Sequence, residues 1–305
     1  MKNDGELLME SIIAEKIIVN AIETTKPTWS TWGVHWNELN DVFLYRAYDQ
    51  LGFDDWIFAS VLKKNNLLSI EKIGSILDHG NFERKYDREI AGSLTGPLYI
   101  LMKKGVFGEE GINFYKSVNE FAGRKGAAFW KLLWQMLICC NYLKNNYKGD
   151  LGYYLKVKYA EYKDLSNISD NEFLSMSNEE WTDFKESTNP WNELYGVGLN
   201  VFDYIMGDVE ELEFVKILYK LDSANKRFLT VTGIFNCLPH ELEYKEVINY
   251  LEQLNLPYTL REINKGLYAY CSKLGCDKYC FCRNPDKCVE CNVNDICKKE
   301  FHKYS

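Results

Sequence analysis

Cysteines are concentrated near the end of this sequence. Of ten cysteines in 305 residues, seven fall between residues 271 and 297, and the other three are scattered. The first thirty residues are acidic and carry no apolar export signal, so we expect a cytoplasmic protein whose thiols stay reduced. Reduced thiols this dense in a short polar segment are exposed to oxidation unless they bind a metal. The clustering therefore predicts a metal site, and structural zinc suits four such cysteines on chemical grounds.

Asp222 is the carboxylate with the clearest local role. It directly precedes the segment Ser223–Leu229, whose pattern is helical. Aspartate and serine are favoured at a helix N-cap, where the side chain accepts hydrogen bonds from free backbone N–H groups. Either Asp222 or Ser223 can cap this helix, and capping alone is a sufficient reason for an aspartate here. Lys226 and Arg227 follow on the same helix.

A glycine pair lies 24 residues before Asp222. Residues 190–200 read PWNELYGVGLN, with Gly196 and Gly198 separated by one residue. Such a pair allows a tight turn between two helices whose exposed backbone N–H groups can face a phosphate oxygen. The turn can equally serve only to join two helices.

Together these segments resemble a known family. Leu194-Tyr195-Gly196-Val197-Gly198 is similar to the hairpin of the helix-hairpin-helix DNA glycosylases, which include endonuclease III and the adenine glycosylase. The segment from Leu221 to Arg227 resembles the part of those enzymes that carries the catalytic aspartate. The resemblance covers about a quarter of the chain. It implies a two-lobed, all-α fold with a C-terminal iron-sulfur loop.

The resemblance also implies roles for individual residues. Asp222 would stabilise the positive charge that develops at the sugar C1′ as a base departs. DNA would be contacted by the hairpin and by the helix after Asp222, through Tyr195, Gly196, Val197, Gly198, Asn200, Lys226 and Arg227. Family members that also cleave the strand carry a lysine where this chain has Asn200. That departure predicts a glycosylase without lyase activity, which acts on an extruded base.

The cysteine spacing extends the resemblance to a cofactor. The last three cysteines, Cys288, Cys291 and Cys297, are separated by two and then by five residues. This spacing reproduces the end of the family's 4Fe-4S motif. The fourth ligand is ambiguous, because Cys280 lies one residue farther from Cys288 than in the family and Cys282 one residue nearer. We expect Cys280, with Cys282 as the alternative, and zinc as the alternative metal. Arg283, Lys287, Lys298 and Lys299 would then be near DNA phosphates.

Periodicity supplies the elements that must position these residues. Apolar residues recur three and four apart over most of the chain, and only six prolines interrupt them, which predicts a helical protein. Residues 126–143 are apolar nearly all round, as in a buried helix. We expect an N-terminal helical region at 1–120 that partly packs with the cluster lobe, a domain with the hairpin and Asp222 at 121–235, and a cluster region at 236–305.

Charge and composition set the remaining expectations. The chain has a net charge of -8, but residues 261–305 carry nine Lys and Arg against six Asp and Glu. We expect double-stranded DNA as partner, no membrane span, and a monomer. Trp191 and Tyr195, beside the hairpin, are candidates for stacking on a base. Residues 36–52 are similar to a helix of the alpha-glutamyl/putrescinyl thymine pyrophosphorylase group, which suggests hypermodified phage DNA as an alternative substrate. The acidic balance of residues 1–260 leaves a non-catalytic DNA-binding protein as a further alternative.

Overall fold

Helices form the regular structure of this protein. The computed structural model describes residues 4–31, 33–47, 55–78, 97–125, 127–272 and 279–304. Within these ranges every named element is an α-helix or a 3-10 helix, and an isolated bridge joins Val34 and Val209. The all-helical class expected from periodicity is confirmed. No helix in the described ranges is long and apolar enough to cross a membrane. Cys276 and residues 48–52 lie outside them.

The chain divides into two compact units that each combine distant segments. The first, here called the cysteine unit, comprises Met1–Gly33, Met206–Asp208 and Phe214–Ser305. The second, the hairpin unit, comprises Val34–Ile205 and Val209–Glu213. The three consecutive ranges expected from the sequence, with boundaries at 120 and 235, differ from this division. The expected N-terminal region is divided after Gly33, and its first part belongs to the same unit as the C-terminal segment.

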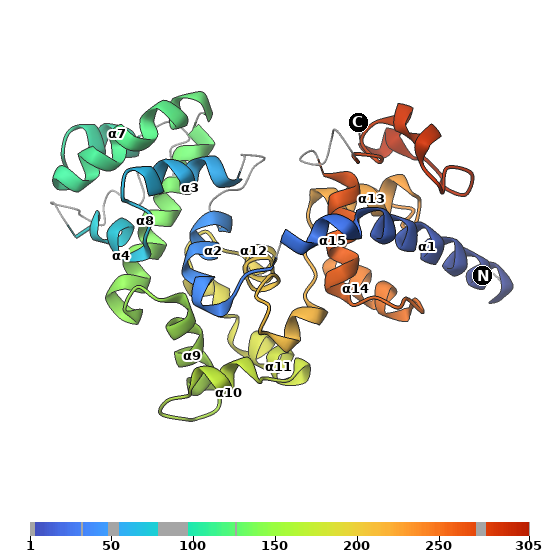
Figure 1. The fold of residues 1–305 in the computed structure, drawn as a ribbon, viewed down its shortest axis with the longest axis horizontal. Helices are drawn as coiled ribbons and strands as arrows, with labels where there is room; N and C mark the ends of the chain where they lie inside the picture. The colour runs from blue at the N-terminus through green and yellow to red at the C-terminus, as the bar shows by residue number, and fades with distance from the viewer. Residues whose placement is uncertain are drawn as a thin grey trace. The chain divides into compact units, whose positions relative to one another are not determined.

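Where the structure describes it, the cysteine unit contains four α-helices and the C-terminal segment (Figure 1). The α-helices are α1 (Asp4–Thr25), α13 (Ser223–Val231), α14 (Tyr244–Gln253) and α15 (Leu260–Cys271). Short 3-10 helices η6 (Pro285–Glu290) and η7 (Phe301–Tyr304) follow. Their shared core includes Ile18 and Ile22 of α1, Phe228 of α13 and Leu267 of α15. Burial of these side chains supplies the main stabilisation of the unit.

Helix α1 packs closely on α15 because of a glycine. A Cβ at Gly266 of α15 would lie 2.6 Å from a side-chain carbon of Ile22 and 3.0 Å from its Cα, so only glycine permits this approach. The two helices are also joined by the hydrogen bond from Asn20 Nδ2 to the hydroxyl of Tyr270, at 3.0 Å. The N-terminal helix is therefore fixed to the helix that leads into the cysteine segment.

The hairpin unit contains the remaining helices (Figure 1). They are α2 (Leu39–Arg46), α3 (Asp55–Lys64), α4 (Ile70–Ser75), α6 (Pro97–Lys103), α7 (Gly108–Lys125), α8 (Ala127–Tyr147), α9 (Leu151–Tyr162), α10 (Asp170–Leu174), α11 (Asn178–Thr188) and α12 (Leu199–Met206), with 3-10 helices η2 (Trp36–Glu38) and η3 (Pro190–Glu193). Helix α8 contains the apolar stretch expected to be a buried helix, and this is confirmed: Phe129, Trp134, Leu137 and Leu143 are almost fully buried. A capping box of Ser177 and Glu180 starts α11.

Candidate functional site: a cysteine pocket, a capped aspartate and a glycine turn

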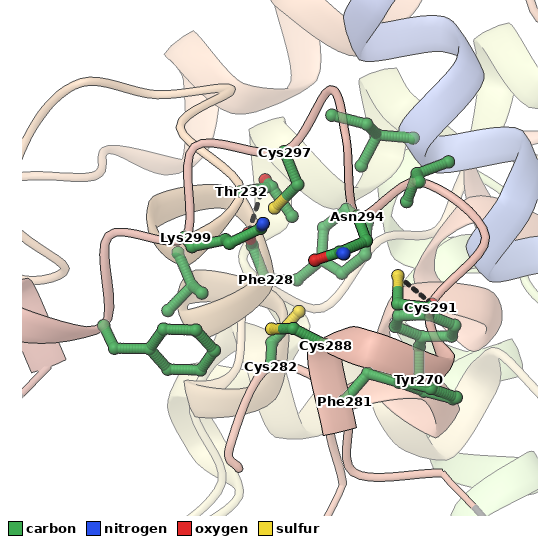
Figure 2. A pocket seen from close by; sticks show the side chains of 14 residues that line it. Phe228, Thr232, Tyr270, Phe281, Cys282, Cys288, Cys291, Asn294, Cys297 and Lys299 are labelled. Carbon is green, nitrogen blue, oxygen red and sulfur yellow. Dashed lines mark hydrogen bonds between the residues drawn. The ribbon is translucent and has the colours of Figure 1, made fainter. Parts of the chain in front are cut away.

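Four cysteines of the C-terminal segment line one pocket in the cysteine unit. They are Cys282, Cys288, Cys291 and Cys297. Figure 2 shows them together with Phe228 of α13, Thr232, which directly follows α13, and Tyr270 of α15. Ile17 of α1 contributes to the same wall. The helix that begins at Asp222 therefore forms part of the surroundings of the cysteines.

Backbone hydrogen bonds attach the cysteine segment to α13 and α15. The N–H of Lys298 donates to the carbonyl of Thr232 at 3.2 Å, and the N–H of Glu300 donates to that of Val231 at 2.8 Å. At the other end, the N–H of Phe281 donates to the carbonyl of Tyr270 at 3.1 Å. Because both ends are tied to helices, the positions of the four cysteines depend on the fold of the whole unit.

The structure distinguishes Cys280 from Cys282, the two alternatives that the spacing left open for the fourth ligand. Cys282 lines the pocket with Cys288, Cys291 and Cys297, whereas Cys280 does not. Cys280 has a φ of 62°, and its carbonyl accepts hydrogen bonds from the N–H groups of Arg283 and Asn284, so it forms the corner of a turn. This turn directs the chain so that the second of the two cysteines faces the pocket.

Burial and mutual proximity favour the neutral form of three of these thiols. The pKa of Cys282 is raised well above its ordinary value by a hydrogen bond with Cys271 and by burial. Burial, together with the neighbouring thiols Cys282, Cys291 and Cys288, raises the pKa of Cys297 to about 11. Burial also raises the pKa of Cys288. The thiols can become thiolates together only when positive charge enters the pocket, as it does when a metal binds.

The residue types that line the pocket are those of a thiolate-ligated metal group. Four thiols face one space with largely apolar walls. The side chain of Arg227 lies near Cys282, where its positive charge partly opposes the rise of the thiol pKa, and its buried Nε has no hydrogen-bond partner among the described residues. An arginine in this position can balance the negative charge of a thiolate-ligated centre.

The arrangement of the thiols bears on which metal group fits. Four thiolates at about 2.3 Å from one tetrahedral zinc lie roughly 3.8 Å from one another. In the described part of the chain, no three His, Cys, Asp or Glu side chains are arranged so that they could share one ion. The cavity between the cysteines measures about 20 Å³, which is space for about one water molecule. Binding of a zinc ion therefore requires the thiols to converge, and binding of a larger iron-sulfur cluster requires them to move apart.

Asp222 is the N-cap of α13, as the sequence predicted. Its Oδ1 accepts hydrogen bonds from the backbone N–H groups of Ala224 and Asn225, each at 2.9 Å. The side-chain Nδ2 of Asn225 donates to the same oxygen at 3.1 Å. Its Oδ2 accepts no hydrogen bond from any described residue, and the side chain is only half-buried. The carboxylate is thus held by one oxygen and presents the other.

Two residues that the sequence did not single out fix the orientation of Asp222. Asn225 is fully buried, and its Oδ1 accepts a hydrogen bond from the hydroxyl of Tyr219 at 2.8 Å. Burial and the charge of Asp222 raise the pKa of Tyr219 well above its ordinary value, so the phenol remains a donor. The amide of Asn225 must therefore turn its Nδ2 toward Asp222. No local sequence pattern marks these linked hydrogen bonds from Tyr219 through Asn225 to Asp222, because they depend on burial.

The two basic residues after Asp222 lie in different surroundings. The Nζ of Lys226 donates to the carbonyl of Leu242 at 3.4 Å. The guanidinium of Arg227 stacks on the ring of Tyr304, 3.8 Å from its centroid, and lies close to the cysteines. Burial and the nearby Arg283 lower the pKa of Arg227. Both were expected to contact DNA, and Arg227 is placed beside the cysteine pocket.

In the hairpin unit, the glycine pair forms a tight turn between helices. The N–H of Val197 donates to the carbonyl of Leu194 at 2.9 Å, and Gly196 has a φ of +85°. A positive φ at the third residue of a hydrogen-bonded four-residue turn is the type II pattern, which requires glycine. A Cβ on Gly196 would also lie 2.7 Å from Cβ of Gln135. The turn is therefore fixed by backbone conformation and by its packing on α8.

The exposed side of this turn carries the residues expected to contact DNA. Tyr195, Gly196, Gly198 and Asn200 are exposed, while Val197 is buried and anchors the turn. Gly198 precedes α12 and its carbonyl accepts from the N–H of Phe202 at 2.9 Å. The first N–H groups of a helix have no partner within it, so those at the start of α12 are available to an anion.

Aromatic and charged contacts hold the two helices of the hairpin together. Trp181 of α11 stacks on Phe202 of α12 with ring centroids 5.9 Å apart and planes 7° apart. Trp191 packs on the same phenylalanine at 5.8 Å, which leaves Tyr195 the more exposed of the two expected stacking residues. Lys185 forms an ion pair with the buried carboxylate of Asp203 at 3.0 Å. These contacts give the turn a rigid base.

Comparisons with protein-family models, with curated proteins and with solved structures found no match for this chain. Function is therefore inferred from the residues and contacts described above.

Proposed function

We propose that this chain is a DNA glycosylase that breaks the N-glycosidic bond of a damaged or modified base in double-stranded DNA. The observation that carries the proposal is the position of α13. Its first turn is capped by Asp222, and its residues Phe228 and Val231 line the cysteine pocket. The glycosylase resemblance links the same two features, a catalytic aspartate and a cysteine-ligated cluster, although they are far apart in this sequence.

In this proposal Asp222 acts through the oxygen that has no partner in the described residues. Its Oδ1 is held by three N–H groups, so the carboxylate does not rotate freely. Its Oδ2 can stabilise the positive charge that develops at C1′ as the base leaves, and can orient the attacking water. The target nucleotide must first be extruded from the duplex, because the bond is out of reach in stacked DNA.

The glycine turn binds a phosphate of the DNA backbone. Gly196 and Gly198 leave the backbone exposed, so N–H groups near the start of α12 can donate to phosphate oxygens without any basic side chain. This mode of binding is compatible with an acidic chain. Asn200 has no amine with which to attack C1′, which supports hydrolysis rather than a Schiff-base route.

We assign the cofactor to Cys282, Cys288, Cys291 and Cys297, with Cys282 in place of Cys280 because it lines the pocket with the other three. A 4Fe-4S cluster bound there would cross-link the C-terminal segment, a mainly structural contribution. The chain's own part is to hold the segment by the hydrogen bonds from Lys298 and Glu300 to the end of α13. Zinc is the alternative.

A base-release assay tests the enzymatic part of the proposal. Purified protein is incubated with duplexes that contain natural, damaged and phage-type modified bases, and alkali then cleaves any abasic sites. Release of one base class is the expected result. Release restricted to hypermodified thymines would favour a role in defence against phage or in the modification of phage DNA. Binding without release of any base would contradict catalysis and leave a DNA-binding protein.

Two aspartate variants make this assay specific. Asp222→Asn should abolish release while DNA binding persists, because the amide can keep the cap but lacks the negative charge. Asp150 caps α9 through one hydrogen bond to the N–H of Tyr153 and provides a matched control, so Asp150→Asn should keep full activity. An active Asp222→Asn variant would show that Asp222 only caps α13 and has no catalytic role. Borohydride trapping of a protein–DNA adduct would contradict the hydrolytic route.

Anaerobic purification tests the cofactor separately. The expected protein is yellow-brown, contains iron and acid-labile sulfide, and absorbs near roughly 400 nm, as thiolate-ligated clusters do. Cys282→Ala should lose this chromophore and Cys280→Ala should keep it. A colourless protein with about one equivalent of zinc would refute the iron-sulfur assignment.

A further inference from the structure

The segment that leads into Asp222 has no regular secondary structure. Residues 218–222 belong to no helix, and Tyr219 and Leu221 within them are buried. The N–H of Asp222 donates to the carbonyl of Lys220 at 2.9 Å, but this contact joins two residues of the same segment. Buried backbone of this kind keeps one position when groups from elsewhere in the fold satisfy its hydrogen bonds. The position of Asp222 therefore depends on contacts from outside the segment.

Asn264 of α15 provides one of these contacts. Its Nδ2 donates to the carbonyl of Lys220 at 2.8 Å. The carbonyl thus accepts two hydrogen bonds, one from Asn264 and one from the N–H of Asp222, which is the full capacity of a carbonyl oxygen. Asn264 is buried, at 4% exposure, so water does not compete for this bond. The segment before Asp222 is therefore tied directly to α15.

A neighbouring arginine decides which way the amide of Asn264 points. Nη1 of Arg261 donates to Oδ1 of Asn264 at 2.9 Å, and a guanidinium has donors only. Oδ1 must therefore face Arg261, which leaves Nδ2 to face Lys220. Asp208 in turn holds the arginine: its Oδ1 accepts from Nη2 of Arg261 at 2.5 Å and lies 3.3 Å from Nζ of Lys265. The hydrogen bonds run without interruption from Asp208 to the carbonyl of Lys220.

The burial of these charges favours a role in geometry over one in stability. The side chains of Arg261 and Asp208 are 7% and 2% exposed. Taking two charges out of water opposes most of the attraction between them, so apolar side chains of similar volume can fill such a space at least as stably. Apolar side chains cannot orient an amide or bind a carbonyl. The ion pair is therefore explained by the position that it gives to Asn264.

We infer that Asn264, oriented by Arg261 and Asp208, is a positioning residue that fixes the segment before Asp222 and so sets the direction of its Oδ2. The catalytic consequence of this inference rests on the proposed function. Asn225 already holds Oδ1 from within α13. With the backbone held from α15 as well, the carboxylate is placed from two sides, and Oδ2 keeps the position from which it acts on C1′.

Amide hydrogen exchange tests whether Asn264 fixes the segment, without any measurement of activity. Asn264→Ala removes the donor to Lys220. Asn264→Asp also removes it but keeps an acceptor for Arg261, so this variant carries the test if the alanine variant does not fold. In both, the N–H of Asp222 should exchange about tenfold faster than in the parent protein, as expected when one buried hydrogen bond is lost. None of these contacts involves a cysteine, so the test applies with or without a bound metal.

Single-turnover base release tests the catalytic consequence. The rate constant should fall by about tenfold to about 100-fold, since a misplacement of about 1 Å can cost about that much, while the Kd for DNA stays unchanged. A variant that is only less stable would contain fewer active molecules, but each would keep the parent rate constant. The rate constant is therefore normalised to the fraction of folded protein.

Asn141→Ala is the matched control. Nδ2 of Asn141 on α8 donates to the carbonyl of Gly74 at 2.8 Å, so the variant loses the same kind of long-range hydrogen bond in the hairpin unit. Exchange at Asp222 and the rate constant of base release should both keep the parent values.

The outcomes separate this inference from the proposed function. Unchanged exchange at Asp222 in both Asn264 variants overturns the inference, whether or not the parent protein releases a base. Faster exchange with an unchanged rate constant overturns the positioning role and leaves the proposed function standing. If the parent protein releases no base, the proposed function fails and the catalytic role of Asn264 fails with it, while faster exchange would still show that Asn264 fixes the segment.

Discussion

Replacing Asp222 by alanine should cost more stability than the loss of an ordinary helix cap. The N-cap itself contributes about 1 kcal/mol to the free energy of unfolding. The substitution also leaves Nδ2 of the fully buried Asn225 without its acceptor, and an unpaired buried donor costs about 1–3 kcal/mol. We therefore expect a loss of roughly 2–4 kcal/mol. Asp222→Asn should cost less than about 1 kcal/mol, because asparagine caps helices as well as aspartate does.

Urea unfolding followed by circular dichroism measures these differences, and Asp150→Ala provides the reference. Asp150 caps α9 through the N–H of Tyr153, so its loss should cost only about 1 kcal/mol. Hydrogen exchange at the first turn of α13 shows whether the effect is local. If Asp222→Ala lowers the free energy of unfolding no more than Asp150→Ala does, Asn225 does not depend on Asp222. The hydrogen bonds from Tyr219 through Asn225 then have no role in positioning the carboxylate.

Three further predictions follow from glycines and from thiols. Gly196→Ala should destabilise the hairpin unit by about 1–3 kcal/mol in thermal unfolding, since Gly196 has a positive φ and packs on Gln135, and it should also weaken DNA binding. Gly198→Ala should leave the stability nearly unchanged, because a Cβ there would have no atom of a described residue within 4 Å apart from its chain neighbours; equal losses of stability would contradict the type II turn. Gly233→Ala should lower the free energy of unfolding by about 1–3 kcal/mol and reduce metal retention, because Gly233 has a φ of +75° and lies under the side chain of Lys298, next to Cys297. Unchanged metal content in the purified variant would show that Gly233 does not affect metal binding. In metal-free protein, Cys297 has a pKa of about 11 against an ordinary 9.0, so the folded state favours the neutral thiol. The free energy of unfolding measured in urea should therefore be highest below pH 9 and should fall as the pH rises toward about 11. Cys297→Ser should reduce this fall, and an equally steep fall in that variant would assign it to other groups.

The sequence determined the features that depend on near neighbours along the chain. The caps at Ser177 and Asp222 follow from side chains that reach N–H groups two or three residues away. The buried helix α8 follows from an uninterrupted apolar stretch, and the all-helical class follows from periodicity. The tight turn follows from glycine itself, because few other residues adopt a positive φ. In each case the cause lies within a few residues, so the sequence suffices.

Tertiary structure decided which residues meet. The sequence left Cys280, the expected ligand, and Cys282 as alternatives, whereas a turn at Cys280 and the hydrogen bonds from the segment to α13 and α15 bring Cys282 into the pocket. The contact of Asn20 with Tyr270 spans 250 residues. The support of Asp222 by Asn225 and Tyr219 arises only because both side chains are buried and must satisfy each other. Burial and long-range pairing are properties of the packed chain, and no local pattern encodes them.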